Sequence, residues 1–145
     1  MPNDITSAAA KSADTYTFEE AKAIVKTVET VINEKDIEAV ANGFTEDAVV
    51  HFGDFPEIRG RAAIRDFMAT RWVRQQDYQL RKTLHVVMGN IFAGTWEGDW
   101  TDSKSVKKMV GFGTEIWYME GQRIARWEAA FNIREEGAGP SLAIT

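Results

Sequence analysis

The hydrophobic positions of this chain follow a helical period in the first half and a strand period in the second half. One helical face is formed by apolar residues spaced three or four apart: Phe18, Ala21, Val25, Val28 and Ile32. Thr17 and Glu20 form a capping box that starts this helix, and Asn33 lies near its end. The pattern predicts an amphipathic helix that turns its apolar face to the core.

Two further helices and a strand are predicted before the period changes. Asp36 is placed to cap a short helix that runs to Ala41, with Gly43 beyond it as a left-handed stop. The run Ala48 to Phe52 contains β-branched and aromatic residues and predicts a strand. Arg61 to Val73 carries apolar residues on one side, which predicts a third helix.

From Tyr78 onward, apolar and polar residues alternate and turn signals recur, which is typical of an antiparallel meander. The predicted strands are Gln79–Met88, Ile91–Trp100, Ser105–Met119 and Arg123–Arg134. The last two form a hairpin around Glu120-Gly121. Gly111 and Gly113 lie within its first strand, where glycines at i and i+2 favour curvature over a flat sheet. A curved sheet has a concave side that can hold a ligand.

Length and composition narrow the class of protein. The chain has 145 residues, which is the size of one domain, and we expect that domain at residues 17–134 between flexible tails at 1–16 and 135–145. There is no cysteine, so thiol catalysis and disulfides are excluded. The formal charge of −5 argues against a nucleic-acid partner. No signal peptide and no run of about 18 apolar residues is present, which favours a cytoplasmic protein without a membrane partner.

Glu115 is the strongest candidate for acid–base chemistry. A carboxylate in an apolar strand must be solvated, paired with an arginine, or have a raised pKa. The hairpin register decides its role. A two-residue turn at Glu120-Gly121 would place Glu115 opposite Arg126, as a structural ion pair. A three-residue turn would place Glu115 and Trp117 beside Ala125 and Trp127, as an acid in an aromatic pocket.

Two other polar residues are candidates. His51 lies on the first predicted strand, where its imidazole would exchange a proton near neutral pH or would serve only as a hydrogen-bonded strand residue. Asp54 lies in the following loop, either at the mouth of a pocket or in a solvated turn. No His, Cys or Asp spacing indicates a metal site, and no glycine-rich loop indicates a phosphate or other cofactor.

Aromatic residues are the candidate walls of a binding site. They are Trp72, Trp96, Trp100, Trp117, Trp127 and Phe131. Core packing explains most aromatic stripes at strand spacing, but small-molecule pockets use the same residues. The sequence therefore predicts either a filled core or an aromatic pocket for a small, largely apolar ligand.

Two segments of the chain, Phe44–His51 (FTEDAVVH) and Arg59–Phe67 (RGRAAIRDF), carry a family resemblance. They resemble the SnoaL-like polyketide cyclases and ketosteroid isomerase relatives of the nuclear transport factor 2-like superfamily. The similarity to an uncharacterised branch continues through Trp72, Asp77–Lys82, Gly89-Asn90 and Glu97-x-x-Trp100. The resemblance implies a cone-shaped α+β fold with three N-terminal helices packed on a curved antiparallel sheet. It also implies a pocket between the helices and the sheet, and a homodimer packed through the sheets.

The chain departs from this family pattern at the site of catalysis. The isomerases and cyclases place a catalytic Asp where this chain has Phe52, and Asp54 comes two residues later. Our first hypothesis, favoured by a glutamate in an aromatic strand, is cofactor-free acid–base chemistry of the isomerase, cyclase or lyase type, with Glu115 as acid or base and His51 as its partner. The second, favoured by the missing Asp, is a non-catalytic binding or dimerisation module, in which Glu115 pairs with Arg126.

Overall fold

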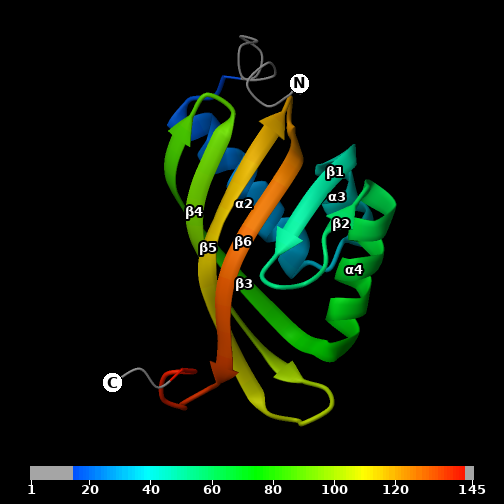
Figure 1. Cartoon of the computed structure of the whole chain (residues 1–145), viewed down its shortest axis with the longest axis vertical. Helices are drawn as coiled ribbons and strands as arrows, with labels where there is room; N and C mark the ends of the chain where they lie inside the picture. Colours follow the sequence, from blue (N-terminus) through cyan, green and yellow to red (C-terminus); the bar gives the residue numbers. More distant parts are fainter. Residues whose placement is uncertain (1–14, 143–145) are drawn as a thin grey trace.

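The computed structural model describes residues 15–142, in which three helices lie against one six-stranded sheet (Figure 1). The helices are α2 (Phe18–Asn33), α3 (Ile37–Asn42) and α4 (Arg61–Arg74). The strands are β1 (Phe44–Phe52), β2 (Ile58–Arg59), β3 (Gln75–Met88), β4 (Ile91–Asp102), β5 (Lys108–Glu120) and β6 (Arg123–Glu135). Most of the predicted tail at 1–16 lies outside the described residues. Tyr16 packs its ring against Phe92, so ordered packing begins before α2.

The local signals of the first half place the helices correctly. Thr17 and Glu20 form the predicted capping box, in which the Glu20 amide donates to Thr17 Oγ1 at 3.1 Å and the Thr17 amide donates to Glu20 Oε1 at 2.8 Å. Asp36 caps α3 through the amide of Ala39. Gly43, however, has a φ of −75° and does not form the expected left-handed stop. Glycine is not required there by its backbone conformation.

The sheet is mixed, because β1 is parallel to β6 while all other neighbours are antiparallel. Its order is β2-β1-β6-β5-β4-β3. β1 begins at Phe44, four residues earlier than predicted, because Phe44 pairs with Ile124. The Ile124 amide also donates to the Gly43 carbonyl at 2.8 Å. This pairing places the strand that carries His51 next to the last strand of the meander.

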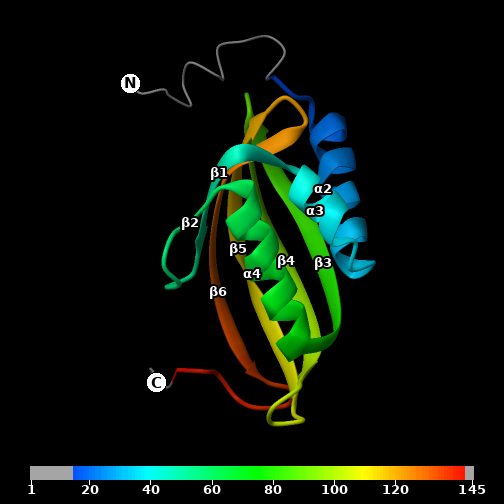
Figure 2. The same ribbon diagram turned by 90° about the vertical axis from the view of Figure 1, so that its right-hand side faces the viewer.

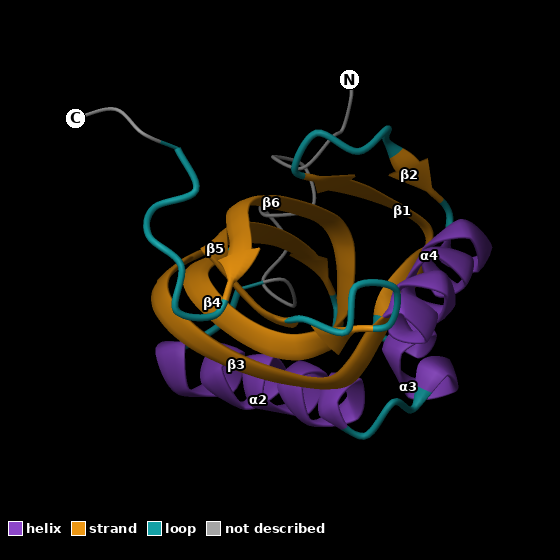
Figure 3. Cartoon of the chain, turned by 90° about the horizontal axis from the view of Figure 1, so that it is seen from below, coloured by secondary structure: helices purple, strands orange, loops and turns teal. Residues whose placement is uncertain are grey.

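The sheet curls around its concave side, and the helices cover that side from different directions (Figures 2 and 3). α2 lies along β3, and α4 lies beside β1 and the lower part of the sheet. Three core tryptophans, Trp96, Trp100 and Trp117, point to the concave side from β4 and β5. The predicted cone-shaped α+β architecture is confirmed.

Glycines in the strands allow backbones to approach closely. A Cβ atom on Gly113 would lie 2.2 Å from the Ala130 carbonyl oxygen of β6. A Cβ atom on Gly94 would lie 2.3 Å from the Thr83 carbonyl oxygen of β3. Gly111 instead makes room for the Trp100 ring, which lies 3.2 Å from where its Cβ would be. Glycine is thus required where a neighbouring backbone or ring approaches the strand this closely.

The hairpin register differs from both predicted alternatives. The turn consists of Gly121 and Gln122, since Glu120 pairs with Arg123. A register shift follows, because Ala125 is left without a partner between Ile124 and Arg126. Trp117 therefore lies directly opposite Trp127. Glu115 lies opposite Ala129, and neither Arg126 nor Trp127 is its cross-strand neighbour.

We expect Gly113→Ala to lower the free energy of unfolding by about 1–3 kcal/mol, because the new methyl group would force β5 and β6 apart. Gly139→Ala is the matched control, since a Cβ there meets no atom within 4 Å. Urea denaturation of the three proteins measures the difference. Equal stability of Gly113→Ala and the wild type would show that the close approach at Ala130 does not constrain the sheet.

Candidate functional site

A buried ion pair lies at the centre of the concave side. Lys82 of β3 places Nζ 2.8 Å from both carboxylate oxygens of Glu115 on β5. The two side chains are only 3% and 6% exposed. Glu115 Oε1 also accepts hydrogen bonds from the indole Nε1 atoms of Trp117, at 3.0 Å, and Trp127, at 2.9 Å. The four side chains tie β3, β5 and β6 together, and are called the Glu115 cluster below.

The Glu115 cluster is internally satisfied. Oε1 of Glu115 accepts from three donors, and Oε2 accepts from Lys82. Lys82 Nζ also lies 5.3 Å from the ring centroid of Trp117 and 5.6 Å from that of Trp127, within range of cation–π attraction. Few lone pairs of the carboxylate remain for a substrate, so the arrangement favours a structural role.

Glu115 forms an ion pair, but not with Arg126, the cation that the ion-pair alternative predicted. Arg126 lies opposite Tyr118 and donates to Glu128 at 2.6 Å, away from Glu115. The unpredicted partner is Lys82, which is 33 residues distant in the sequence. The alternation along β3 could have indicated that Lys82 points inward, since it shares a face with the buried Leu80 and the partly buried Leu84.

His51 and Glu115 are not brought together. Val50 and Phe52 on either side of His51 are buried, so the imidazole points to the opposite face of β1. Its side chain is 42% exposed, and Nε2 lies 3.6 Å from Glu57 Oε1. The outer face of the sheet thus holds His51, while the concave side holds Glu115.

A cavity of about 660 Å³ lies between α4, the β1–β2 loop and the lower part of the sheet. We call it the α4 cavity. Its aromatic lining comprises Phe52, Phe55, Phe67, Trp96, Trp100 and Phe131. Arg71 of α4 supplies a cationic group to the same wall. Three of the predicted binding residues, Trp96, Trp100 and Phe131, therefore share one cavity.

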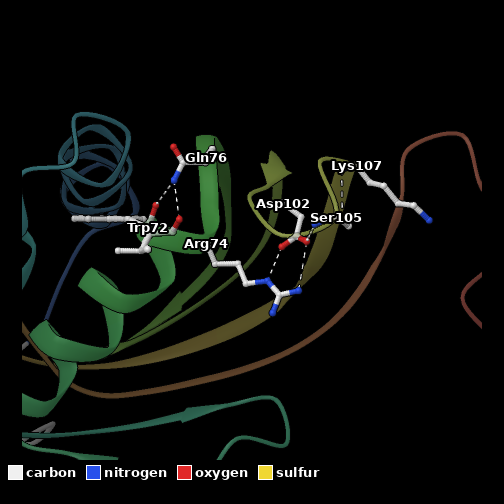
Figure 4. Close-up of polar contacts among 7 residues, drawn as sticks. Trp72, Arg74, Gln76, Asp102, Ser105 and Lys107 are labelled. Carbon is white, nitrogen blue, oxygen red and sulfur yellow. Dashed lines mark hydrogen bonds and ion pairs between the residues drawn. The ribbon is translucent and has the colours of Figure 1, made fainter.

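The rim of the α4 cavity is held by a salt bridge between α4 and β4 (Figure 4). Arg74 Nε lies 2.5 Å from Asp102 Oδ1, and Arg74 Nη2 lies 3.3 Å from Oδ2. The Ser105 amide donates to Asp102 Oδ2 at 2.9 Å. The Arg74 hydrogen bonds, followed by those from Ser105, hold the pKa of Asp102 well below its usual range. Asp102 therefore keeps its charge and fixes the end of α4 to the β4–β5 loop.

A second cavity of about 520 Å³ lies under α2 and α3, and we call it the α2 cavity. Lys82, Trp117 and Trp127 of the Glu115 cluster are part of its lining, which is otherwise mainly aliphatic. A recess of about 20 Å³ lies between the two cavities and contacts Lys82 and Trp127 as well as Arg71 and Trp96. The predicted aromatic pair Trp117 and Trp127 thus belongs to a different cavity from Trp96 and Trp100.

Two of the predicted binding residues, Trp72 and Asp54, line neither cavity, and neither do the predicted catalytic residues Glu115 and His51. Trp72 is partly buried on α4, with Lys35 Nζ 6.0 Å from its ring centroid. Asp54 is exposed in the β1–β2 loop. Within residues 15–142, no group of three His, Asp or Glu side chains is arranged to hold a metal ion. No helix in that range combines the length and hydrophobicity that a bilayer crossing requires.

The sequence matches the protein family described as "Protein of unknown function (DUF1348)" over residues 14–135. The chain belongs to this family. The match covers all the described helices and strands of the DUF1348 protein, from α2 to β6. No curated protein sequence matches the chain.

Solved structures share the fold at low sequence identity. The epoxide hydrolase/cyclase-like enzyme SalBIII, described in pyran ring formation in the polyether salinomycin, has a TM-score of 0.72 and 17% identity, over 81% of this chain and 96% of that one. A candidate isomerase from Bacillus subtilis has a TM-score of 0.70 and 20% identity, over 79% and 88%. An LEH-like epoxide hydrolase from M. tuberculosis has a TM-score of 0.63 and 16% identity, over 79% and 84%. The predicted nuclear transport factor 2-like fold of this DUF1348 protein is confirmed.

We expect Glu115→Gln to lower the free energy of unfolding by about 3–5 kcal/mol, because Lys82 would remain buried without its counter-ion. Glu120→Gln, an exposed position at the end of the same strand, is the control. Thermal and urea unfolding of the two variants would measure the loss. A Glu115→Gln protein as stable as the wild type would contradict the structural role of the Glu115 cluster.

Proposed function

We propose that the protein binds a small, largely apolar organic molecule in the α4 cavity. The observation that carries this proposal is the aromatic lining of a cavity of about 660 Å³, which falls within the usual range for small-molecule sites. Phe55 is 51% exposed at its edge, an exposure that a bound apolar ligand would reduce. The likeness to epoxide hydrolase/cyclase-like and isomerase-like structures supports a ligand pocket in this fold.

The contacts of Glu115 favour binding over acid–base catalysis by that residue. Glu115 is not part of the α4 cavity lining, and Oε1 already accepts from three donors. His51, its proposed partner, lies on the other face of the sheet. A general base must reach the proton that it removes, directly or through one water. The non-catalytic alternative therefore has more support than acid–base chemistry by this pair.

Two blocking variants test the location of the ligand. Thr70 lines the α4 cavity, and Thr27 lines the α2 cavity. Both are exposed helix residues, and a tryptophan at either position would fill part of its cavity. We expect 2-naphthylmethanol to bind the wild type saturably in isothermal titration calorimetry. Thr70→Trp should weaken that binding at least about tenfold, a loss of about 1.4 kcal/mol, whereas Thr27→Trp should preserve it.

If Thr27→Trp weakens binding and Thr70→Trp preserves it, the ligand binds in the α2 cavity instead. Absence of binding of both 2-naphthylmethanol and the bulkier ketone 1-tetralone to the wild type would contradict the proposed function. Circular dichroism of each variant would show that the helices are intact.

We further propose that the protein forms a homodimer through the outer face of its sheet. Paired positions across β4, β5 and β6 form an uncharged row there, consisting of Thr95, Thr114 and Ala130. Phe112 and Ile116 flank this row and are 44% and 37% exposed. A self-complementary patch of this kind fits a two-fold symmetric contact, in which the same surface is used by both copies.

We expect the wild type to elute as a dimer in size-exclusion chromatography with light scattering, and Ile116→Lys to elute as a monomer. A lysine in each copy would place like charges against an apolar surface. Phe18→Lys is the control, because Phe18 is also an exposed apolar residue but lies on α2, outside the patch. A monomeric wild type, or a dimeric Ile116→Lys variant, would exclude this interface.

A further inference from the structure

Arg71 contributes a cation to the lining of the α4 cavity. Its Nε donates to Gln75 Oε1 at 3.1 Å, and Nη1 lies 3.7 Å from Met68 Sδ. Its guanidinium carbon lies 4.7 Å from the ring centroid of Phe52 and 5.7 Å from that of Phe67. The surroundings are thus mainly aromatic rings and neutral groups.

No carboxylate among residues 15–142 forms an ion pair with Arg71. Burial lowers its pKa, and only the nearby Tyr78 hydroxyl acts against that effect. Burying a cation without a counter-ion is costly, and proteins usually pair such a group or leave it in water. By contrast, the neighbouring Arg74 on the same helix has Asp102 as its partner.

A donor in the lining of the same cavity lacks an acceptor. The indole Nε1 of Trp96 is buried and makes no hydrogen bond in the described structure. Trp96 and Arg71 line the α4 cavity together, and both also contact the small recess behind it. Buried polar groups without a partner are rare in native proteins and call for an explanation. Here the cation of Arg71, which has no counter-ion among the described residues, and the unpartnered indole N–H of Trp96 line the same cavity.

We propose that the ligand of the α4 cavity carries a carboxylate, which Arg71 binds with help from Trp96 Nε1. This inference rests on the proposed binding function and specifies its ligand class: an organic monoanion with an apolar or aromatic body. The planar guanidinium presents paired N–H groups that match the two oxygens of a carboxylate. The apolar body would contact Phe52, Trp100 and Phe131.

A carboxylate fits this wall better than a phosphate does. Arg71 supplies one positive charge to an aromatic environment, so a monoanion would neutralise it. A phosphate dianion would leave a net negative charge away from water, and that charge is expensive to bury. Arg74, the other guanidinium of the lining, is already paired with Asp102.

The test compares two probes with the same ring system, 2-naphthoate and 2-naphthylmethanol. We expect the wild type to bind the carboxylate at least about tenfold more tightly than the alcohol in isothermal titration calorimetry, as for a charge-assisted hydrogen bond. Arg71→Met should abolish that preference. 2-Naphthyl phosphate should bind the wild type more weakly than 2-naphthoate.

Arg65→Met is the matched control. It removes one positive charge from the same helix, but Arg65 pairs with Glu38 and lies outside the α4 cavity. It should keep the preference for 2-naphthoate. Arg71→Lys retains the charge without the planar fork, and we expect an intermediate preference. This second variant keeps the test decisive if Arg71→Met does not fold.

The outcomes separate the two proposals. Equal binding of acid and alcohol by the wild type, or an unchanged preference in Arg71→Met, would overturn the carboxylate site and leave the proposed apolar binding function intact. Failure of both probes to bind would overturn the proposed function itself. Tighter binding of the phosphate than of the carboxylate would assign the Arg71 site to a dianion instead.

Discussion

The buried contact between Lys82 and Glu115 is the constraint on which the interior of this protein depends. Each ion loses its hydration, and the loss is offset only because the geometry is close and the two indole N–H groups complete the carboxylate's hydrogen bonds. Together with the hydrogen bond from Trp127, the contact joins three strands that are not all neighbours, since β3 and β6 lie on opposite sides of the β4–β5 pair. The curl of the sheet is therefore fixed by side chains as well as by backbone pairing.

The same contact separates two cavities of different chemistry. Lys82, Trp117 and Trp127 form part of the α2 cavity, while the α4 cavity is lined by Trp96, Trp100 and Arg71. A carboxylate in an aromatic strand indicated chemistry when read from the sequence. In the folded protein this carboxylate holds together the side chains that separate the α2 cavity from the α4 cavity. The aromatic residues that remain open to a ligand lie below that wall, beside α4.

Local patterns predicted the elements, and long-range pairing decided the site. The capping box at Thr17 and the alternation of Phe92, Trp96 and Trp100 depend on residues close in sequence, so they could be read directly. The role of Glu115 could not, because one unpaired residue at Ala125 shifts the whole hairpin register. The alternation of Val50, His51 and Phe52 sets the face on which His51 lies, whereas its place beside β6 depends on the parallel pairing of β1 with β6, for which no local sequence signal exists.

Lys82 and Arg71 show how two inward cations in one fold come to have different roles. Lys82 has its counter-ion, Glu115, on another strand of the same sheet, so its charge has a structural role. Arg71 lies on a helix and faces rings and neutral groups, so no part of the described chain neutralises it. Natural sequences tolerate an unmet charge of this kind mainly where function requires it. The position of this charge in the lining of an aromatic cavity is what would give the proposed binding site its polarity.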